Sequence, residues 1–307
     1  MTVSTDSPIG FIGVGRMGHG MLKNLLAAGA SVHVYDLDPS ALAAAAALGA
    51  TPHADPAAVA ARVKTLFLCV PAGPEVRAVL FGDHANPATA VVASATNGLL
   101  IVDHTTYNRD EAEGVAARAR EHAMRYADCP ISGMPQRADN GTLTIMFGGA
   151  ADDFADAQAY LNVTGEFVVH CGEVGTGQLM KAFNNVIYDI NIAAFCELLP
   201  LALRAGLDQD VLAKVVTSGS SRSFASEYFV PRILAGEFRD DFSLSAAYKD
   251  IQNVQETATR LHAMTPLTSA MVAVYQQAIA QGYGDEPKSS MIKVYEQQLD
   301  IEFRHDG

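Results

Sequence analysis

Hydrophobic positions in the first half of the chain form short continuous runs separated by stretches of helical period. Ile9 to Val14 is an apolar run that predicts a buried strand. The next stretch repeats every three or four residues and predicts a helix that ends at Gly29. Similar runs predict further strands at Ser31 to Tyr35, Lys64 to Val70 and Leu99 to Asp103. The alanine-rich segment from Ser40 to Leu48 predicts another helix. This alternation is typical of an α/β domain with a doubly wound parallel sheet.

The pattern changes after Gly175. From Gln178 to Arg204 the apolar positions keep a helical period, and Gly206 ends the segment. At about 1.5 Å per residue this helix spans roughly 40 Å. Its apolar positions are Leu179, Phe183, Ile187, Ile190 and Ala194. Every later segment is helical in pattern, so the sequence predicts a sheet domain at residues 1–172 and an all-helical domain at residues 173–307, joined by this long interdomain helix.

Composition and charge narrow the class of protein. The 307 residues suffice for two domains, and the contents of 49% hydrophobic and 18% charged residues are typical of a folded soluble protein. A net charge of −13 argues against nucleic acid as a partner. No signal peptide is recognisable at the amino terminus, and no run reaches the ~18 uncharged apolar residues of a membrane span. The four cysteines form no metal or redox motif. We therefore expect a cytoplasmic protein with no membrane contact and no metal.

A glycine-rich turn follows the first strand directly. Gly13, Gly15 and Gly18 form a G-x-G-x-x-G pattern, with Arg16 and Met17 inside it. The pattern has a strand before it, a helix after it and an acidic residue, Asp36, at close to the expected spacing of ~20 residues. Such turns place a pyrophosphate on the helix amino terminus. Asp36 can bind a free ribose and repel a 2′-phosphate, so NAD is favoured over NADP.

Polar residues follow other strands of the predicted sheet, where doubly wound folds bind ligands. Thr105 and Thr106 come after the strand that ends at Asp103. They are candidates for the nicotinamide half of the site, and capping of the next helix is the competing explanation. Ser132 and Gly133 follow a later short strand. A hydroxyl and accessible N–H groups there could hold a carboxylate.

The long helix carries an unusual polar group near its start. Lys181 and Asn185 are four residues apart, and Asn184 is three from the lysine, so the three can share one face. Buried polar groups need partners. Spacing alone fits either a binding or catalytic cluster or a lysine at the wet edge of the helix.

Four motifs in this order resemble the β-hydroxyacid dehydrogenase family, which includes 3-hydroxyisobutyrate dehydrogenase and tartronate semialdehyde reductase. They span nearly the whole chain: Gly10-Phe-Ile-Gly-Val-Gly-Arg-Met-Gly18, Asp128-Cys-Pro-Ile-Ser-Gly133, Gly175-x-Gly-x-x-x-Lys181-x-x-Asn-Asn185 and Lys249-Asp250. The resemblance implies a Rossmann domain, a helical second domain and NAD(P)-dependent interconversion of a 3-hydroxy acid with its semialdehyde or keto acid.

The resemblance also implies roles for single residues. Lys181 becomes the general acid/base, and Ser132, Gly133 and Asn185 hold the substrate. The implied cofactor contacts beyond the glycine turn are Val70, Pro71, Thr106 and Lys249. Chemistry agrees, because hydride loss from a carbinol requires a base for the hydroxyl proton, and burial beside a positive nicotinamide would lower the pKa of a lysine.

Two departures from the family pattern bear on the substrate. Met134 and Arg137 stand where the family usually has glycines, so Met134 would reshape the pocket and Arg137 could add a cation. Arg222 is a further candidate for binding a carboxylate, with a solvated arginine as the competing explanation. The particular acid stays open.

Two other functions are alternatives to a dehydrogenase. An imine reductase typically replaces the motif lysine, and a non-catalytic module would not need the glycine fingerprint with Lys181 and Asn185. The apolar surface of the long helix exceeds what one domain can cover, so a homodimer or homotetramer is expected.

Overall fold

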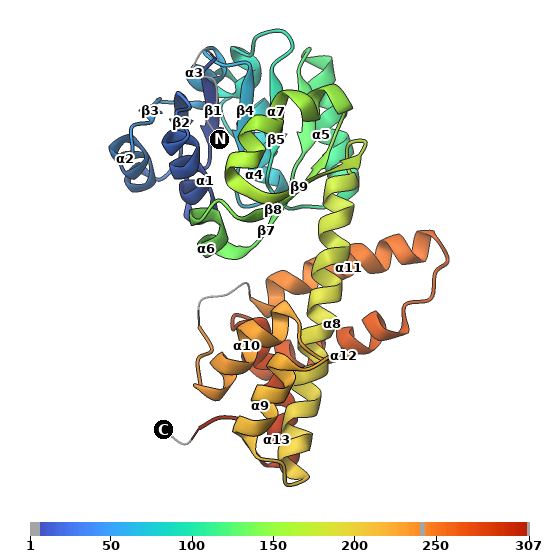
Figure 1. The fold of residues 1–307 in the computed structure, drawn as a ribbon. Helices are drawn as coiled ribbons and strands as arrows, with labels where there is room; N and C mark the ends of the chain where they lie inside the picture. Colours follow the sequence, from blue (N-terminus) through green and yellow to red (C-terminus); the bar gives the residue numbers. More distant parts are fainter. Residues whose placement is uncertain (1–6, 240–242, 306–307) are drawn as a thin grey trace. The chain divides into compact units, whose positions relative to one another are not determined.

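A computed structural model describes residues 7–239 and 243–305. The chain forms two compact units, one up to Lys181 and one from Ala182 onward, and each is described by itself. Figure 1 shows the sheet of the first unit and the helices of the second.

The first unit contains a nine-stranded sheet in the order β3-β2-β1-β4-β5-β6-β8-β7, with β9 also pairing with β8. Strands β1 to β6 follow one another in parallel, whereas β8 runs antiparallel to β6 and β7 and parallel to β9. The strands are β1 Ile9–Ile12, β2 Val32–Tyr35, β3 Thr51–Pro52, β4 Thr65–Leu68, β5 Leu100–Asp103, β6 Arg125–Asp128, β7 Ile131–Ser132, β8 Leu143–Gly148 and β9 Gly165–Gly172. The predicted strands are therefore present, one or two residues shorter at their ends.

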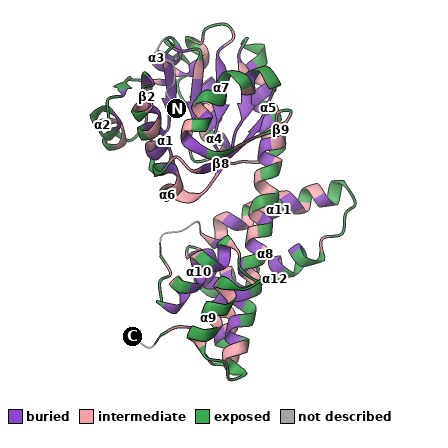
Figure 2. Cartoon of the chain, viewed as in Figure 1, coloured by how far each residue is buried: buried purple, intermediate pink, exposed green. Residues whose placement is uncertain are grey.

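Helices cover both faces of this sheet, which confirms the doubly wound fold. Side chains alternate along β1, where Phe11 enters one core and Ile12 the other. The first core packs against α1 Arg16–Ala27, α2 Pro39–Ala47, α6 Met134–Asp139 and α7 Ala151–Thr164. The second packs against α3 Pro56–Ala60, α4 Gly73–Phe81, η2 Val91–Ala93 and α5 Arg109–Glu121, and η1 Pro87–Thr89 lies between α4 and η2 in the chain. Buried strands between exposed helix faces are visible in Figure 2.

Helix α8, Thr176–Arg204, begins two residues before the predicted start and contains Pro200. The apolar positions of α8 differ in burial. Phe183 and Ile187 are 42% and 61% exposed, whereas the positions that pack into the second unit are Val186, Ile192, Phe195, Cys196 and Leu199. An apolar period fixes the helix, but the neighbouring helices decide which apolar side is covered.

The second unit is helical throughout its described part, as predicted. Its elements after α8 are α9 Gln209–Ser218, α10 Phe224–Leu234, α11 Leu244–Arg260, α12 Pro266–Ala278, η3 Ile279–Tyr283, η4 Lys288–Met291 and α13 Ile292–Leu299. Asp208, Ser223 and Ser243 cap the starts of α9, α10 and α11. The elements share one core that includes Val230, Ile251, Tyr275, Met291 and Phe303.

Among the described residues, α8 is one helix that is long and apolar enough to cross a membrane. It meets this criterion although it contains charged residues and therefore has no run of ~18 uncharged apolar positions. This is weak evidence, because core helices of folded proteins meet the same criterion. Asp189, in the middle of α8, is fully buried against Lys288 of the same unit. An ion pair at that position indicates a helix packed within a protein core.

Candidate active site

The glycine turn between β1 and α1 has no space for side chains at two of its three glycines. A Cβ at Gly13, which has φ of +90°, would lie 2.3 Å from the Cys69 carbonyl oxygen, and one at Gly18 would lie 2.0 Å from that of Gly13. Gly15 is exposed and has nothing within 4 Å of the same position. No side chain caps α1, so its first N–H groups are available to an anion.

The residues between these glycines differ in burial. Arg16 is exposed in the first turn of α1, and Met17 packs partly buried against the first core. The open backbone at Gly15 and the uncapped helix start fit the pyrophosphate of a dinucleotide.

Asp36 lies just beyond the end of β2 and is held by the backbone. Its Oδ2 accepts a hydrogen bond from the Val14 amide at 2.7 Å, and Oδ1 accepts one from the Asp38 amide at 2.8 Å. The first of these bonds fixes the carboxylate beside the glycine turn. Each carboxylate oxygen keeps acceptor capacity for a ribose hydroxyl.

The ends of β4 and β5 meet, as their parallel register requires. Thr105 is buried, and its Oγ1 accepts a hydrogen bond from the Val70 amide at 3.2 Å. Asn108 caps α5 through a bond to the Glu111 amide, so neither threonine serves that purpose. Thr106 is half-buried and Pro71 is exposed.

A buried carboxylate supports this edge of the sheet. Asp103, at the end of β5, accepts hydrogen bonds from the hydroxyls of Tyr107 and Tyr126 at 2.7 and 2.8 Å and from the Thr105 amide at 2.9 Å. Burial raises the pKa of Asp103, and these bonds oppose that rise. Next to it, burial lowers the pKa of His104 to about 4, so the stacked ring on Phe67 is neutral at pH 7.

The first turn of α8 is tied to the same edge. Asp128, at the end of β6, accepts hydrogen bonds from the amides of Gly175 and Gln178 at 2.5 and 2.7 Å. Burial raises the pKa of Asp128 to about 6, and both bonds oppose that shift. The Gln178 side chain donates to the Thr105 carbonyl at 2.7 Å and accepts from the Tyr107 amide at 3.1 Å. Lys181 is half-buried and follows Gln178 by nearly one turn.

The β7–α6 turn carries the predicted carboxylate-binding group. Ser132 ends β7, and Gly133 follows with φ of +143°. Met134 has φ of +61°, a left-handed conformation that costs a side chain roughly 1–2 kcal/mol. Arg137 is one turn further, and its Nη2 pairs with Glu166 Oε2 at 3.3 Å. The backbone thus keeps a glycine-like path at the position occupied by Met134.

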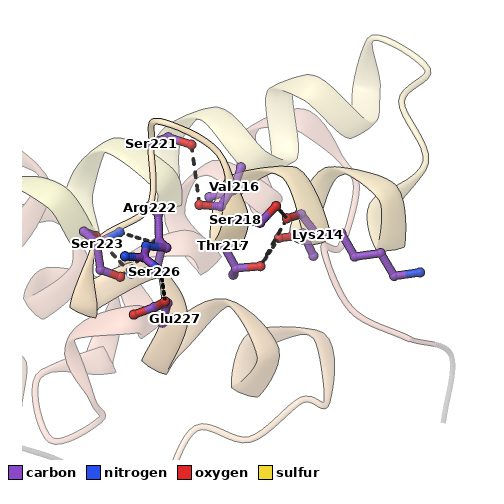
Figure 3. Close-up of polar contacts among 10 residues, drawn as sticks. Lys214, Val216, Thr217, Ser218, Ser221, Arg222, Ser223, Ser226 and Glu227 are labelled. Carbon is purple, nitrogen blue, oxygen red and sulfur yellow. Dashed lines mark hydrogen bonds and ion pairs between the residues drawn. The ribbon is translucent and has the colours of Figure 1, made fainter.

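The second unit holds the remaining predicted residues. Asn185 donates from Nδ2 to Asp250 Oδ2 on α11 at 2.8 Å, and Lys249 is exposed beside it. Asn184 is exposed. Arg222 is 62% exposed, and its Nη1 lies 3.5 Å from Glu227 Oε1 (Figure 3). This geometry describes a solvated arginine in an ion pair; the role of Arg222 in binding stays a prediction.

Several positioning contacts could not be predicted from the sequence. Asp128 as the cap of α8, Gln178 as the bridge to the β5 end, and Asp250 as the partner of Asn185 all join residues distant in sequence. In the sequence, a polar residue among apolar neighbours indicates that its side chain needs a hydrogen-bond partner, but it does not show which residue that partner is.

Comparison with known proteins now decides the family. Residues 8–172 match the NAD binding domain of 6-phosphogluconate dehydrogenase, and residues 175–295 match the NAD-binding domain of NADP-dependent 3-hydroxyisobutyrate dehydrogenase. The chain belongs to the 3-hydroxyisobutyrate dehydrogenase family of β-hydroxyacid dehydrogenases. It is an NAD(P)-dependent 3-hydroxyacid dehydrogenase that acts on CH–OH groups.

Relatives of this dehydrogenase act on different acids. The chain is 32% identical to 2-(hydroxymethyl)glutarate dehydrogenase of Eubacterium barkeri, over 95% of this chain and 96% of that protein. It is 33% identical to L-threonate dehydrogenase of Cupriavidus necator, over 94% and 95%. The structure of 3-hydroxyisobutyrate dehydrogenase from Salmonella typhimurium superposes with a TM-score of 0.84 at 29% identity, over 94% and 100%.

Proposed function

We propose that this dehydrogenase uses NAD to interconvert a small 3-hydroxy acid and its semialdehyde or keto acid, with Lys181 as general acid/base. The observation that carries the proposal is the anchoring of α8. Asp128 and Gln178 fix its first turn to the carboxyl ends of β5 and β6, the edge where doubly wound sheets bind ligands. Lys181 lies three residues after the anchored Gln178, in the next turn of α8 and in the same unit as the glycine turn and Ser132.

The cofactor preference follows from the glycine turn and Asp36. The pyrophosphate binds the uncapped start of α1 at Gly15, and the adenosine ribose binds the carboxylate of Asp36. A 2′-phosphate would be repelled by that carboxylate, which the Val14 amide holds in place. Thr106, Val70 and Pro71, at the ends of β5 and β4, contact the nicotinamide half. Bound at these residues, NAD would supply a hydride acceptor for oxidation and NADH a hydride donor for reduction.

The proton is handled by Lys181. In oxidation its neutral amine takes the proton from the hydroxyl oxygen while the hydride leaves the carbon that carries this hydroxyl. In reduction its ammonium returns a proton to the new alkoxide oxygen. Ser132 and the amide of Gly133 bind the substrate carboxylate, and Asn185 holds the substrate without adding a charge. Met134 shapes the pocket, and Lys249 contacts the cofactor.

Self-association is also part of the proposal. Helices α8 and α9 carry exposed apolar side chains three or four residues apart. They are Phe183, Ile187, Leu198 and Leu201 on α8, and Val211 and Val215 on α9. Surfaces of this kind on a folded unit are typical of association sites. We propose a homodimer or homotetramer formed through the helical unit.

The test of the catalytic assignment is Lys181→Met with a panel of 3-hydroxy acids and NAD, followed as NADH formation. We expect kcat to fall roughly 10²- to 10⁴-fold, because the proton acceptor is lost, while the Kd for NAD stays within about twofold. Lys23→Met, at an exposed lysine of α1, is the matched control and should keep full activity. Near-wild-type turnover by Lys181→Met would reject the role of the lysine.

A further inference from the structure

One side-chain amide pairs with both backbone groups that flank a predicted cofactor contact. The loop at residues 104–108 connects β5 to α5 and contains Thr106, which is predicted to contact the nicotinamide half. Gln178 of α8 donates from Nε2 to the Thr105 carbonyl at 2.7 Å and accepts at Oε1 from the Tyr107 amide at 3.1 Å. Gln178 therefore brackets Thr106 with two hydrogen bonds from one side chain.

The start of α8 does not depend on this side chain. Asp128 accepts hydrogen bonds from the backbone amides of Gly175 and Gln178, and these bonds hold the first turn at the end of β6. A Cβ at Gly177 would lie 2.5 Å from the Met146 carbonyl oxygen, so the helix backbone packs directly on β8. Both contacts involve only backbone atoms of α8. The side chain of Gln178 thus serves the loop rather than the helix start.

The bonds to Gln178 are made away from water. Gln178 and Thr105 are each 2% exposed. Buried backbone groups without a partner are costly, so loss of the side-chain amide forces the Thr105 carbonyl and the Tyr107 N–H to find other partners. The backbone at Thr106, which lies between them, shifts when they do.

The same side chain lies close in sequence to the predicted proton carrier. Lys181 follows Gln178 by three residues on α8, so the two are neighbours on the surface of one helix. In the proposed function Lys181 takes the hydroxyl proton, and Thr106 contacts the half of the cofactor that takes the hydride. Proton and hydride leave the same C–OH group, so the groups that receive them must keep a fixed separation.

We propose that Gln178 is a positioning residue for hydride transfer: its side-chain amide holds the loop at Thr106 in register with Lys181. The inference rests on the proposed function, which assigns the roles of these two residues. Gln178 acts through Thr106 and does not contact the reacting atoms. The affinity for NAD comes mainly from the glycine turn and Asp36, and the affinity for the acid from the β7–α6 turn. Loss of the Gln178 amide therefore lowers kcat far more than it weakens binding.

The experiment replaces Gln178 by Met in the full chain, which removes both hydrogen bonds and keeps a side chain of similar length. The measurements are kcat and KM for the best substrate in the 3-hydroxy acid panel, Kd for NAD, and the midpoint of thermal unfolding. Titration with NAD counts the binding sites, so that kcat is expressed per NAD-binding site. We expect this kcat to fall roughly 10- to 100-fold, with KM for the acid and Kd for NAD changed by less than about threefold.

A second variant and a control accompany this measurement. Gln178→Asn keeps an amide but is one methylene shorter, so it cannot reach both loop groups; it should also lose kcat, and it takes the place of Gln178→Met should that variant fail to fold. Arg125→Met is the matched control, because Arg125 donates to Asp153, Asp156 and the Gly98 carbonyl at the amino end of β6, the sheet edge opposite the site. It should lower the unfolding midpoint and leave kcat per NAD-binding site within about twofold.

Three results would overturn the inference. Wild-type kcat per NAD-binding site in the folded Gln178 variant would show that the amide serves folding alone. An equal fall of kcat in Arg125→Met would show that any loss of polar contacts in this unit has the same effect. A rise in KM or Kd as large as the fall in kcat would assign Gln178 to binding. Absence of turnover by the wild-type chain, or normal turnover by Lys181→Met, would refute the proposed function instead.

Discussion

Two turns of the first unit are each predicted to bind a ligand, and both contain a residue with positive φ. The residue type at this position differs between them. At the β1–α1 turn, Gly13 has φ of +90° and Gly18 lies against the Gly13 carbonyl, so backbone atoms occupy the space of a side chain. At the β7–α6 turn, Met134 has φ of +61° and keeps its side chain at the cost of strain.

The difference shows which turn can be altered. At the turn predicted to bind the cofactor, side chains larger than glycine are excluded sterically, because a Cβ at Gly18 would lie 2.0 Å from the Gly13 carbonyl oxygen. At the turn predicted to bind the substrate, position 134 is limited only by a conformational preference of roughly 1–2 kcal/mol. We therefore expect changes at the first turn to abolish function and changes at the second to redirect it.

The largest effect is expected at Gly18. Gly18→Ala forces a methyl group against the Gly13 carbonyl and should destabilise the chain by about 3 kcal/mol, with loss of NAD binding. Gly15→Ala is the matched control, because its Cβ meets nothing within 4 Å. It should leave unfolding unchanged within about 0.5 kcal/mol and weaken only NAD binding. Chemical unfolding and NAD titration measure both; equal stability of the two variants would break the comparison.

The β5 edge between these turns predicts a pH effect of similar size. His104 has a pKa of about 4 in the folded chain and about 6.5 when unfolded. The unfolded state therefore binds the extra proton between these values, and this group makes stability rise with pH from 4 to 6.5, by roughly 3 kcal/mol. His104→Phe should remove that slope while keeping a ring on Phe67. Parallel stability curves for the variant and the wild type, from urea unfolding at several pH values, would contradict the assignment.

The charge of Asp36 is expected to determine the preference for NAD over NADP. Asp36→Asn keeps an acceptor for the Val14 amide but removes the charge, so the ratio of kcat/KM for NADP over NAD should rise about tenfold or more. Asp38→Asn, two residues on and exposed, is the control for charge alone and should change this ratio less. A wild-type KM for NADP below that for NAD would overturn the assignment of Asp36.

The smallest effect is expected at Met134. Met134→Gly relieves the left-handed strain and removes the side chain, so stability should change by about 1 kcal/mol or less while bulkier hydroxy acids become substrates. His84→Gly relieves the same strain, at φ of +55°, on an exposed residue outside the predicted site. It should match the stability change and leave substrate preference unaltered. Equal preferences in both variants would show that Met134 does not shape the pocket.

Local features could be predicted from the sequence because local residues determine them. The strand–turn–helix at Ile9 to Ala27, Asp36 at the end of β2, and the extent of α8 each follow from period, glycines and caps over short distances. The site around Lys181 could be anticipated only in part, since spacing along a helix shows which residues share a face but not what that face meets. The exposure of Phe183 and Ile187 illustrates this limit.

The two-part fold and the glycine-rich turn could be predicted from the order of residues alone. The partner of each polar residue became known from the packing of the folded chain. Asp128 bonds to Gln178 across 50 positions, Asn185 to Asp250 across 65, and Asp189 to Lys288 across 99. A buried charge must find a partner, and sequence alone states that requirement, but the partner is chosen by which helices and strand ends pack together.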